Sequence, residues 1–89
     1  MQAKIFKNLK LLEIRGNELR EPFSKHIEDG IFEIRNKVGN YITGIFYFFV
    51  IGQKIILTNG FIKKTQKTPK AEIALAKKYR NDYLNREEI

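Results

Sequence analysis

Apolar residues recur at intervals of three or four positions near the start of the chain, between lysines. They are Ile5, Phe6, Leu9, Leu12 and Ile14. This spacing is typical of an amphipathic helix. We therefore predict a helix over residues 3 to 15 that faces the core and ends at Gly16-Asn17, where glycine stops helical propagation.

A change of period separates the next two segments. Residues 19 to 30 contain Pro22 and Gly30 and show no clear period, so we predict a connection with one helical turn at most. Residues 31 to 37 then alternate between two faces, as a half-buried strand does. One face carries Phe32 and Ile34, and the other carries Ile31, Glu33, Arg35 and Lys37.

Two further segments have the composition of strands. Residues 41 to 50 are rich in aromatic and β-branched side chains, as expected of a central strand covered on both faces, although Gly44 interrupts them. A third strand follows at residues 54 to 62. Short turn signals at 38 to 40 and at 51 to 53 separate the three strands, which indicates an antiparallel meander.

The last element is a second helix. Thr68 is expected to cap it and Pro69 to occupy its first position. Its predicted core-facing positions fall four apart, at Ala71, Leu75, Tyr79 and Tyr83. The expected fold is therefore α+β, with a three-strand antiparallel meander between N-terminal and C-terminal helices, in a single domain over residues 1–89.

Charge is concentrated in one part of this chain. The 89 residues carry a formal charge of +7, and residues 61 to 80 contain seven Lys or Arg against one Glu. Such a cluster attracts polyanions by steering and counterion release, which favours nucleic acid, an acidic protein or anionic lipid as partner. A basic surface without a target is the alternative reading.

Other classes of protein fit poorly. The chain has no cysteine, which leaves no disulfide framework or thiolate zinc site and is compatible with the cytosol. Its N-terminus does not read as a secretory signal. The longest apolar run, residues 45 to 51, is far shorter than the ~20 residues of a membrane-spanning helix.

The candidate chemistry is cationic. There is a single histidine, His26, and no carboxylate cluster with metal-ligand spacing, so we predict no metal and no cofactor. Arginine and lysine bind phosphate and stabilise the charge that develops on it under attack. Metal-free RNA cleavage needs only an oriented, deprotonated 2′-OH and stabilised phosphate and leaving oxygens.

Several phrases together resemble the HigB branch of the RelE/ParE superfamily, toxins of bacterial type II toxin–antitoxin systems. In order along the chain they are LLEIRGNELREP, KHIEDGIFEIR, FYFF and GFIKKTQKTPKAEIALAKKYRNDY. They cover roughly residues 4 to 83. The last phrase is the most diagnostic, since it combines Gly-Phe at a strand end, a Lys-Lys pair, Thr-Pro and a basic helix.

The resemblance implies a compact RelE-like sheet with helices on one side and a basic cleft that cuts mRNA in the cytoplasm without metal, usually on the ribosome. It implies a cognate antitoxin, commonly a helix-turn-helix protein. By position, Arg35 would contact the phosphates at the scissile bond, while Lys63 and Lys64 would neutralise backbone or transition-state charge. The expected RNA-binding residues around them are Lys37, Lys67 and Lys70.

Two departures from the family pattern qualify this expectation. The family usually has a cleft arginine where this chain has Gly44, so we expect weakened or absent cleavage, since one charge-assisted phosphate contact contributes about 1.5 to 3 kcal/mol. The usual N-terminal strand and helix also have no counterpart, which would leave a sheet edge exposed and open to self-association or capture by a partner.

Two alternatives therefore stay open. One is a catalytically silent homologue that binds RNA or antitoxin without cutting, which Gly44 favours. The other is a ParE-like inhibitor of DNA gyrase with the same fold, against which the Lys-Lys pair argues. Translation arrest on expression would indicate the ribonuclease branch, and DNA damage would indicate the gyrase inhibitor.

Overall fold

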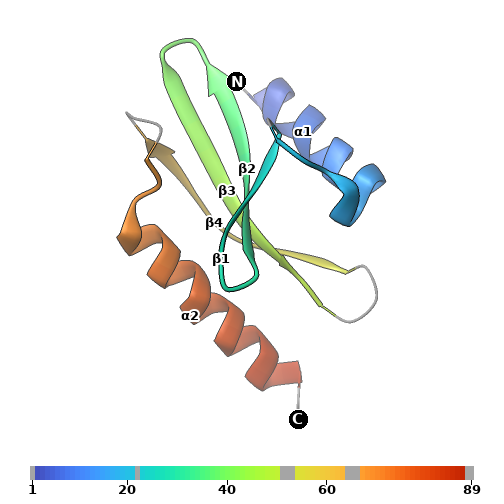
Figure 1. The fold of residues 1–89 in the computed structure, drawn as a ribbon, viewed down its shortest axis with the longest axis vertical. Helices are drawn as coiled ribbons and strands as arrows, with labels where there is room; N and C mark the ends of the chain where they lie inside the picture. Colours follow the sequence, from blue (N-terminus) through green and yellow to red (C-terminus); the bar gives the residue numbers. More distant parts are fainter. Residues whose placement is uncertain (1, 22, 51–53, 64–66, 88–89) are drawn as a thin grey trace.

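A four-stranded antiparallel sheet with two helices makes up the computed structural model, which describes residues 2–21, 23–50, 54–63 and 67–87 (Figure 1). The elements in chain order are helix α1 (Gln2–Arg15), a 3₁₀ turn η1 (Gly16–Glu18), strands β1 (Ser24–Glu28), β2 (Ile31–Val38), β3 (Tyr41–Phe49) and β4 (Ile55–Lys63), and helix α2 (Lys70–Glu87). The α+β class and both helices are confirmed. None of the described helices is long and apolar enough to cross a membrane.

The sheet is a simple meander in the order β1-β2-β3-β4. The three predicted strands are confirmed, but β1 adds a fourth, where the sequence led us to expect a connection. Asp29 and Gly30 form the turn between β1 and β2, with φ angles of 52° and 76°. Positive φ at both central residues is the geometry of the tight hairpin turn that Asp-Gly favours. This pair therefore turns the chain back and pairs β1 with β2.

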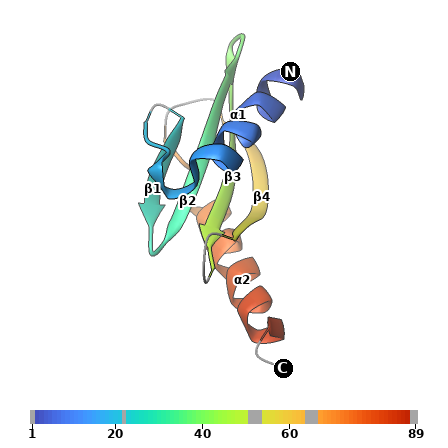
Figure 2. The same cartoon turned by 90° about the vertical axis from the view of Figure 1, so that its right-hand side faces the viewer.

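The two helices cover opposite faces of the sheet, which corrects the expectation of helices on one side. Leu12 of α1 packs in a cluster with Ile34 and Tyr47. On the other face, Ala76 of α2 packs with Ile31 and Phe46 in a second cluster. Since alternate residues of a strand point to opposite faces, the two clusters lie on either side of the sheet. Figure 2 shows that the helices also lie toward opposite ends of the molecule.

Both helices differ in detail from the predicted faces. On α1, Leu12 is buried, but Phe6 and Ile14 are 66% and 70% exposed, because the helix packs mainly against β2 and no described element covers its outer side. On α2, Ala76 and Tyr83 lie against the core, while Tyr79 is 43% exposed.

Polar contacts hold α2 against the β1–β2 turn. Lys77 and Arg80 form ion pairs with Glu28 and Asp29, with N···O separations of 2.5 and 2.8 Å. The Arg80 guanidinium hydrogen-bonds to Asp29 and lowers the pKa of that exposed carboxyl. This basic side of α2 therefore faces the turn, which explains why the helix is rotated from its predicted orientation.

Tyr47 places a hydroxyl group in the core beneath α1. Its ring is buried and stacks on Phe32, with ring centroids 5.4 Å apart. Its hydroxyl shares a hydrogen bond with the buried Ser24 hydroxyl of β1. Burial raises the pKa of Tyr47 above its ordinary value of 10.0, and the hydrogen bond from Ser24 offsets part of that rise. The bond ties β1, the edge strand, to β3.

This environment predicts a pH dependence of stability. An unfolded Tyr47 ionises near pH 10.0 and the folded one only at higher pH. Its stabilising contribution is therefore complete below pH 10 and is lost as the pH rises through the folded pKa. At neutral pH, Tyr47→Phe should lower the free energy of unfolding by about 1 kcal/mol, because the hydrogen bond with Ser24 is lost. As the pH rises from 9 to 11, the free energy of unfolding in urea should fall less for Tyr47→Phe than for the unchanged chain. Tyr41→Phe, which removes an exposed tyrosine, should follow the unchanged chain, and equal slopes for all three would contradict the assignment.

Candidate functional site

Strand pairing brings the predicted cationic residues together on the face that α2 covers. Glu33, Arg35 and Lys37 alternate along β2 on that face, as predicted. Lys37 pairs with Ile42 of β3, and Ile42 pairs with Lys63 of β4. Lys37 and Lys63 therefore lie in one row across the sheet, although 26 positions separate them in the sequence.

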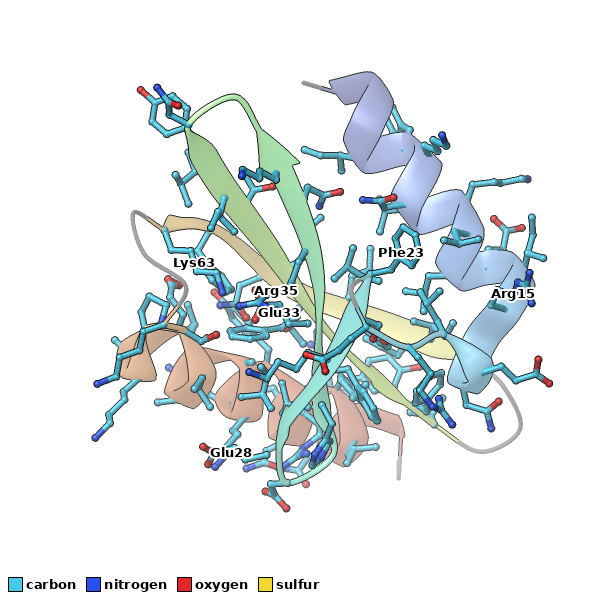
Figure 3. All side chains as sticks on the ribbon, turned by 45° about the horizontal axis from the view of Figure 1, so that its top comes forward. Arg15, Phe23, Glu28, Glu33, Arg35 and Lys63 are labelled. Atoms are coloured by element: carbon cyan, nitrogen blue, oxygen red, sulfur yellow. The ribbon has the colours of Figure 1, made fainter. Side chains whose placement is uncertain are left out.

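Four side chains converge beside the start of α2, and we call them the charged centre: Glu33, Arg35, Lys63 and Thr68. Figure 3 shows Glu33, Arg35 and Lys63 of this group close to one another. Lys63 Nζ lies 2.8 Å from Glu33 Oε2, and Arg35 Nε lies 3.7 Å from the same oxygen. The Thr68 hydroxyl donates to Glu33 Oε1 at 3.0 Å and accepts from Lys63 Nζ at 3.2 Å. One carboxylate thus meets donors from β2, from β4 and from the residues just before α2.

Burial differs sharply within the charged centre. The side chains of Glu33 and Lys63 are 0% and 2% exposed, whereas that of Arg35 is 20% exposed. A charge removed from water is costly unless a partner and hydrogen bonds compensate it. Glu33 and Lys63 supply this compensation to each other inside the protein, and Arg35 extends the charged centre to the surface. With one carboxylate and two cationic groups, the charged centre keeps one excess positive charge.

Gly44, where the resemblance to the HigB branch led us to expect an arginine, lies directly beneath this carboxylate. It pairs with Arg35 on one side and with Phe61 on the other. A Cβ atom at Gly44 would lie 2.6 Å from Glu33 Oε2 and 2.7 Å from Phe61 Cζ, closer than real Cβ contacts come. In this chain the space above Gly44 is therefore filled by Glu33 and Phe61.

The other predicted RNA-binding residues surround the charged centre at the surface. Lys37, Lys67 and Lys70 are all exposed, and we call them the basic rim. Lys37 extends along β2 beyond Arg35, and the other two flank Thr68 in sequence. Lys64 lies outside the described residues.

Two members of the charged centre were missed by reasoning from the sequence. Glu33 was recognised only as a residue on the same face of its strand as Ile31, Arg35 and Lys37, although the apolar Ile31 indicates that this end of the face is covered. Thr68 was expected to cap α2, but its hydroxyl contacts Glu33 and Lys63 instead. The Pro69 carbonyl accepts the first helical bond from Ile73, so the helix begins one residue later than predicted.

A cavity and a histidine that carry polar groups lie on the β1 side of the molecule and contact no member of the charged centre in the part of the chain that the structure describes. A cavity of about 740 Å³ between η1 and β1 is lined by Arg20, Lys25, His26 and Phe32 among others, and contains no predicted site residue. His26 accepts a hydrogen bond from the Gly30 amide at 3.3 Å and so supports the hairpin turn. Across the ranges that the structure describes, no three His, Asp or Glu side chains are grouped to hold a metal ion.

Comparison with known proteins gives a family match. The model of the family described as Phage derived protein Gp49-like (DUF891) matches residues 1–81, which is most of the chain. No curated protein matches the sequence. The matched region includes every member of the charged centre and of the basic rim.

The close approach at Gly44 predicts its response to substitution. Gly44→Ala should force Glu33 or Phe61 to move and lower the free energy of unfolding by about 1 to 3 kcal/mol, as overpacking of a core does. Gly60→Ala is the matched control in the neighbouring strand, since a Cβ there would meet only Gly44 O at 3.6 Å and Ile45 Cγ1 at 3.7 Å. Urea unfolding of both variants measures the difference, and equal free energies would show that Gly44 is not needed for close packing.

Proposed function

This chain belongs to the Phage derived protein Gp49-like family, and from that premise we propose that it is the toxin component of a type II toxin–antitoxin system that acts on mRNA. The family is associated with toxins of such systems. In the proposed reaction the protein cleaves mRNA at the charged centre without metal, on the ribosome in the cytoplasm. The resemblance to the HigB branch supports this choice of target.

One observation carries the proposal. Arg35 from β2, Lys63 from β4 and Thr68 before α2 meet in one place, and the exposed Lys37, Lys67 and Lys70 surround them. A rim of exposed lysines suits the backbone of single-stranded RNA, which such residues bind through counterion release. An arginine set in the centre suits a single phosphate, because its planar group can form two parallel hydrogen bonds.

Each group then has a role in the proposed reaction. Arg35, whose side chain is 20% exposed, contacts the scissile phosphate and stabilises the charge that grows on it. Lys63 adds positive charge at that phosphate, and the resemblance implies the same role for Lys64. The basic rim holds the strand so that the 2′-OH lies in line with the leaving oxygen. We expect slow cleavage, because Gly44 supplies no second arginine.

A catalytically silent RNA-binding or antitoxin-binding protein is the second candidate. The observation that favours it is the pairing of Lys63 with Glu33 at 2.8 Å in a buried position. A lysine held in this way adds little to the binding of an RNA phosphate unless Glu33 moves. The basic rim and Arg35 would still bind RNA in such a protein.

The proposed partners follow from the family. A toxin of this class implies a cognate antitoxin, and we propose a helix-turn-helix protein encoded beside it. We also propose self-association through β4, which lies at one edge of the sheet and presents Leu57 and Ile62, 46% and 64% exposed. A strictly monomeric species in light scattering at high concentration would contradict self-association.

Induced expression tests the proposed function through Arg35. The unchanged chain should arrest growth and produce new mRNA ends in primer extension, and Arg35→Ala should reduce the cleavage about 10- to 100-fold by removing a charge-assisted phosphate contact. Lys10→Ala is the control, since it removes an exposed cation from α1, on the opposite face of the sheet.

The pattern of results separates the candidates. Cleavage that depends on Arg35 and not on Lys10 supports the toxin. RNA binding without new mRNA ends supports the silent homologue, and DNA damage without translation arrest supports a gyrase inhibitor. If the chain causes no growth arrest and binds no RNA, the proposal is overturned.

A further inference from the structure

The carboxylate of Glu33 has the surroundings of a bound phosphate. Its two oxygens meet an ammonium at 2.8 Å, a hydroxyl at 3.0 Å and a guanidinium nitrogen at 3.7 Å. Lysine, arginine and hydroxyl donors around one oxyanion are the groups with which proteins hold phosphate. These three donors would bind a phosphate oxygen as well as they bind the carboxylate oxygens of Glu33.

The charged centre is difficult to explain as a device for stability. A buried ion pair is often no more stabilising than well-packed apolar residues of the same volume, because desolvation offsets the attraction. The arrangement also requires Gly44, and glycine inside a strand weakens it. Two unfavourable features thus coincide at the place where Arg35 reaches the surface, which is typical of functional sites.

We propose that Arg35, Lys63 and Thr68 form a subsite for one phosphate group of RNA, and that Glu33 occupies this subsite until the phosphate displaces it. The inference rests on the proposed function for the identity of the ligand as RNA. With Glu33 in place the charged centre carries one excess positive charge, and with Glu33 turned out the remaining groups carry two. Glu33 is therefore an internal competitor that lowers the affinity for RNA.

The geometry allows this exchange. Glu33 Oε2 is the end of a side chain with three rotatable bonds, and it lies over Gly44, where no side chain blocks it from beneath. The Arg35 side chain is 20% exposed and that of Glu33 is 0% exposed, so Arg35 would meet an entering phosphate first. When the phosphate replaces the Glu33 carboxylate, the buried positive charge of Lys63 still has a negatively charged partner. Thr68 precedes α2, so the exchange takes place beside the positive end of an 18-residue helix.

Glu33→Gln tests the proposal, because it removes the charge and keeps the shape and the hydrogen-bond acceptor. The probe is a short single-stranded RNA with 2′-O-methyl riboses, which cannot be cleaved, measured by fluorescence anisotropy over a range of salt. Glu33→Gln should bind it about tenfold more tightly than the unchanged chain, as for one gained charge-assisted contact. The slope of log K against log[salt] should steepen by about 1.

Glu28→Gln is the matched control. It also removes a carboxylate that pairs with a lysine, in this case Lys77 at 2.5 Å, but on β1 and away from the charged centre. The net charge changes equally in both variants, so general attraction to RNA rises equally. If Glu33→Gln binds no more tightly than Glu28→Gln, and inorganic phosphate raises its melting temperature no more than that of the unchanged chain, the proposal is overturned and Glu33 is structural.

Inorganic phosphate separates this inference from the proposed function. If no form of the chain binds the RNA but phosphate stabilises Glu33→Gln selectively, the RNA target is wrong and the phosphate subsite stands. If Glu33→Gln does not fold, the unchanged chain decides the matter by NMR. The side-chain carboxyl carbon of Glu33 should then shift on addition of RNA or phosphate while that of Glu28 does not, and an unmoved Glu33 signal overturns the proposal.

Discussion

The buried carboxylate of Glu33 is the constraint on which the functional face of this protein depends. Once β2 places that carboxylate inside the protein, positive charge and hydrogen-bond donors must reach it, because an unpaired buried charge costs several kcal/mol. Lys63 and Thr68 meet this need from β4 and from the start of α2. The end of the sheet and the beginning of the helix are therefore held together by one acidic side chain.

The same constraint explains why β3 contains a glycine in its centre. The resemblance to the HigB branch led us to expect an arginine at position 44, so glycine there implies that one phosphate contact is missing. In the structure Gly44 is also the position that leaves room for Glu33 and Phe61, whose atoms would lie within 2.7 Å of any Cβ. The absent arginine and the inward carboxylate are thus two parts of one arrangement, since both cannot occupy the space above β3.

Features that depend on local pattern were predictable from the sequence. The alternation in β2 gave the correct faces, and Gly16 and Gly39 marked the end of α1 and the turn after β2. The strand β1 was missed because Pro22 and an absent period outweighed Asp29-Gly30, which is itself a strong hairpin signal. The exposure of Phe6 could not be read from its spacing, because it depends on how much of α1 the sheet covers.

The charged centre was predictable only in part, for a physical reason. The sequence identified Arg35 and Lys63 as cations on strands, but the burial of Lys63 depends on Glu33, which lies 30 positions earlier and two strands away. Pairing across a sheet is set by register and by helix packing, and neither leaves a local signal at Lys63. Thr68 has the sequence context of a helix cap, and only the three-dimensional arrangement shows the contacts it makes instead.

The contacts of α2 change the meaning of the basic stretch at residues 61 to 80. Of its seven cationic residues, Lys63, Lys77 and Arg80 form ion pairs with Glu33, Glu28 and Asp29. Lys77 and Arg80 hold the helix against the β1–β2 turn, and Lys63 joins β4 to β2, so the charge of these three residues is balanced within the protein. Lys67, Lys70 and Lys78 are exposed on the surface that a polyanion would meet. The formal charge of residues 61 to 80 therefore overstates the electric field that an RNA strand would meet. For RNA binding, the position of Arg35 beside the start of α2 matters more than the number of lysines around it.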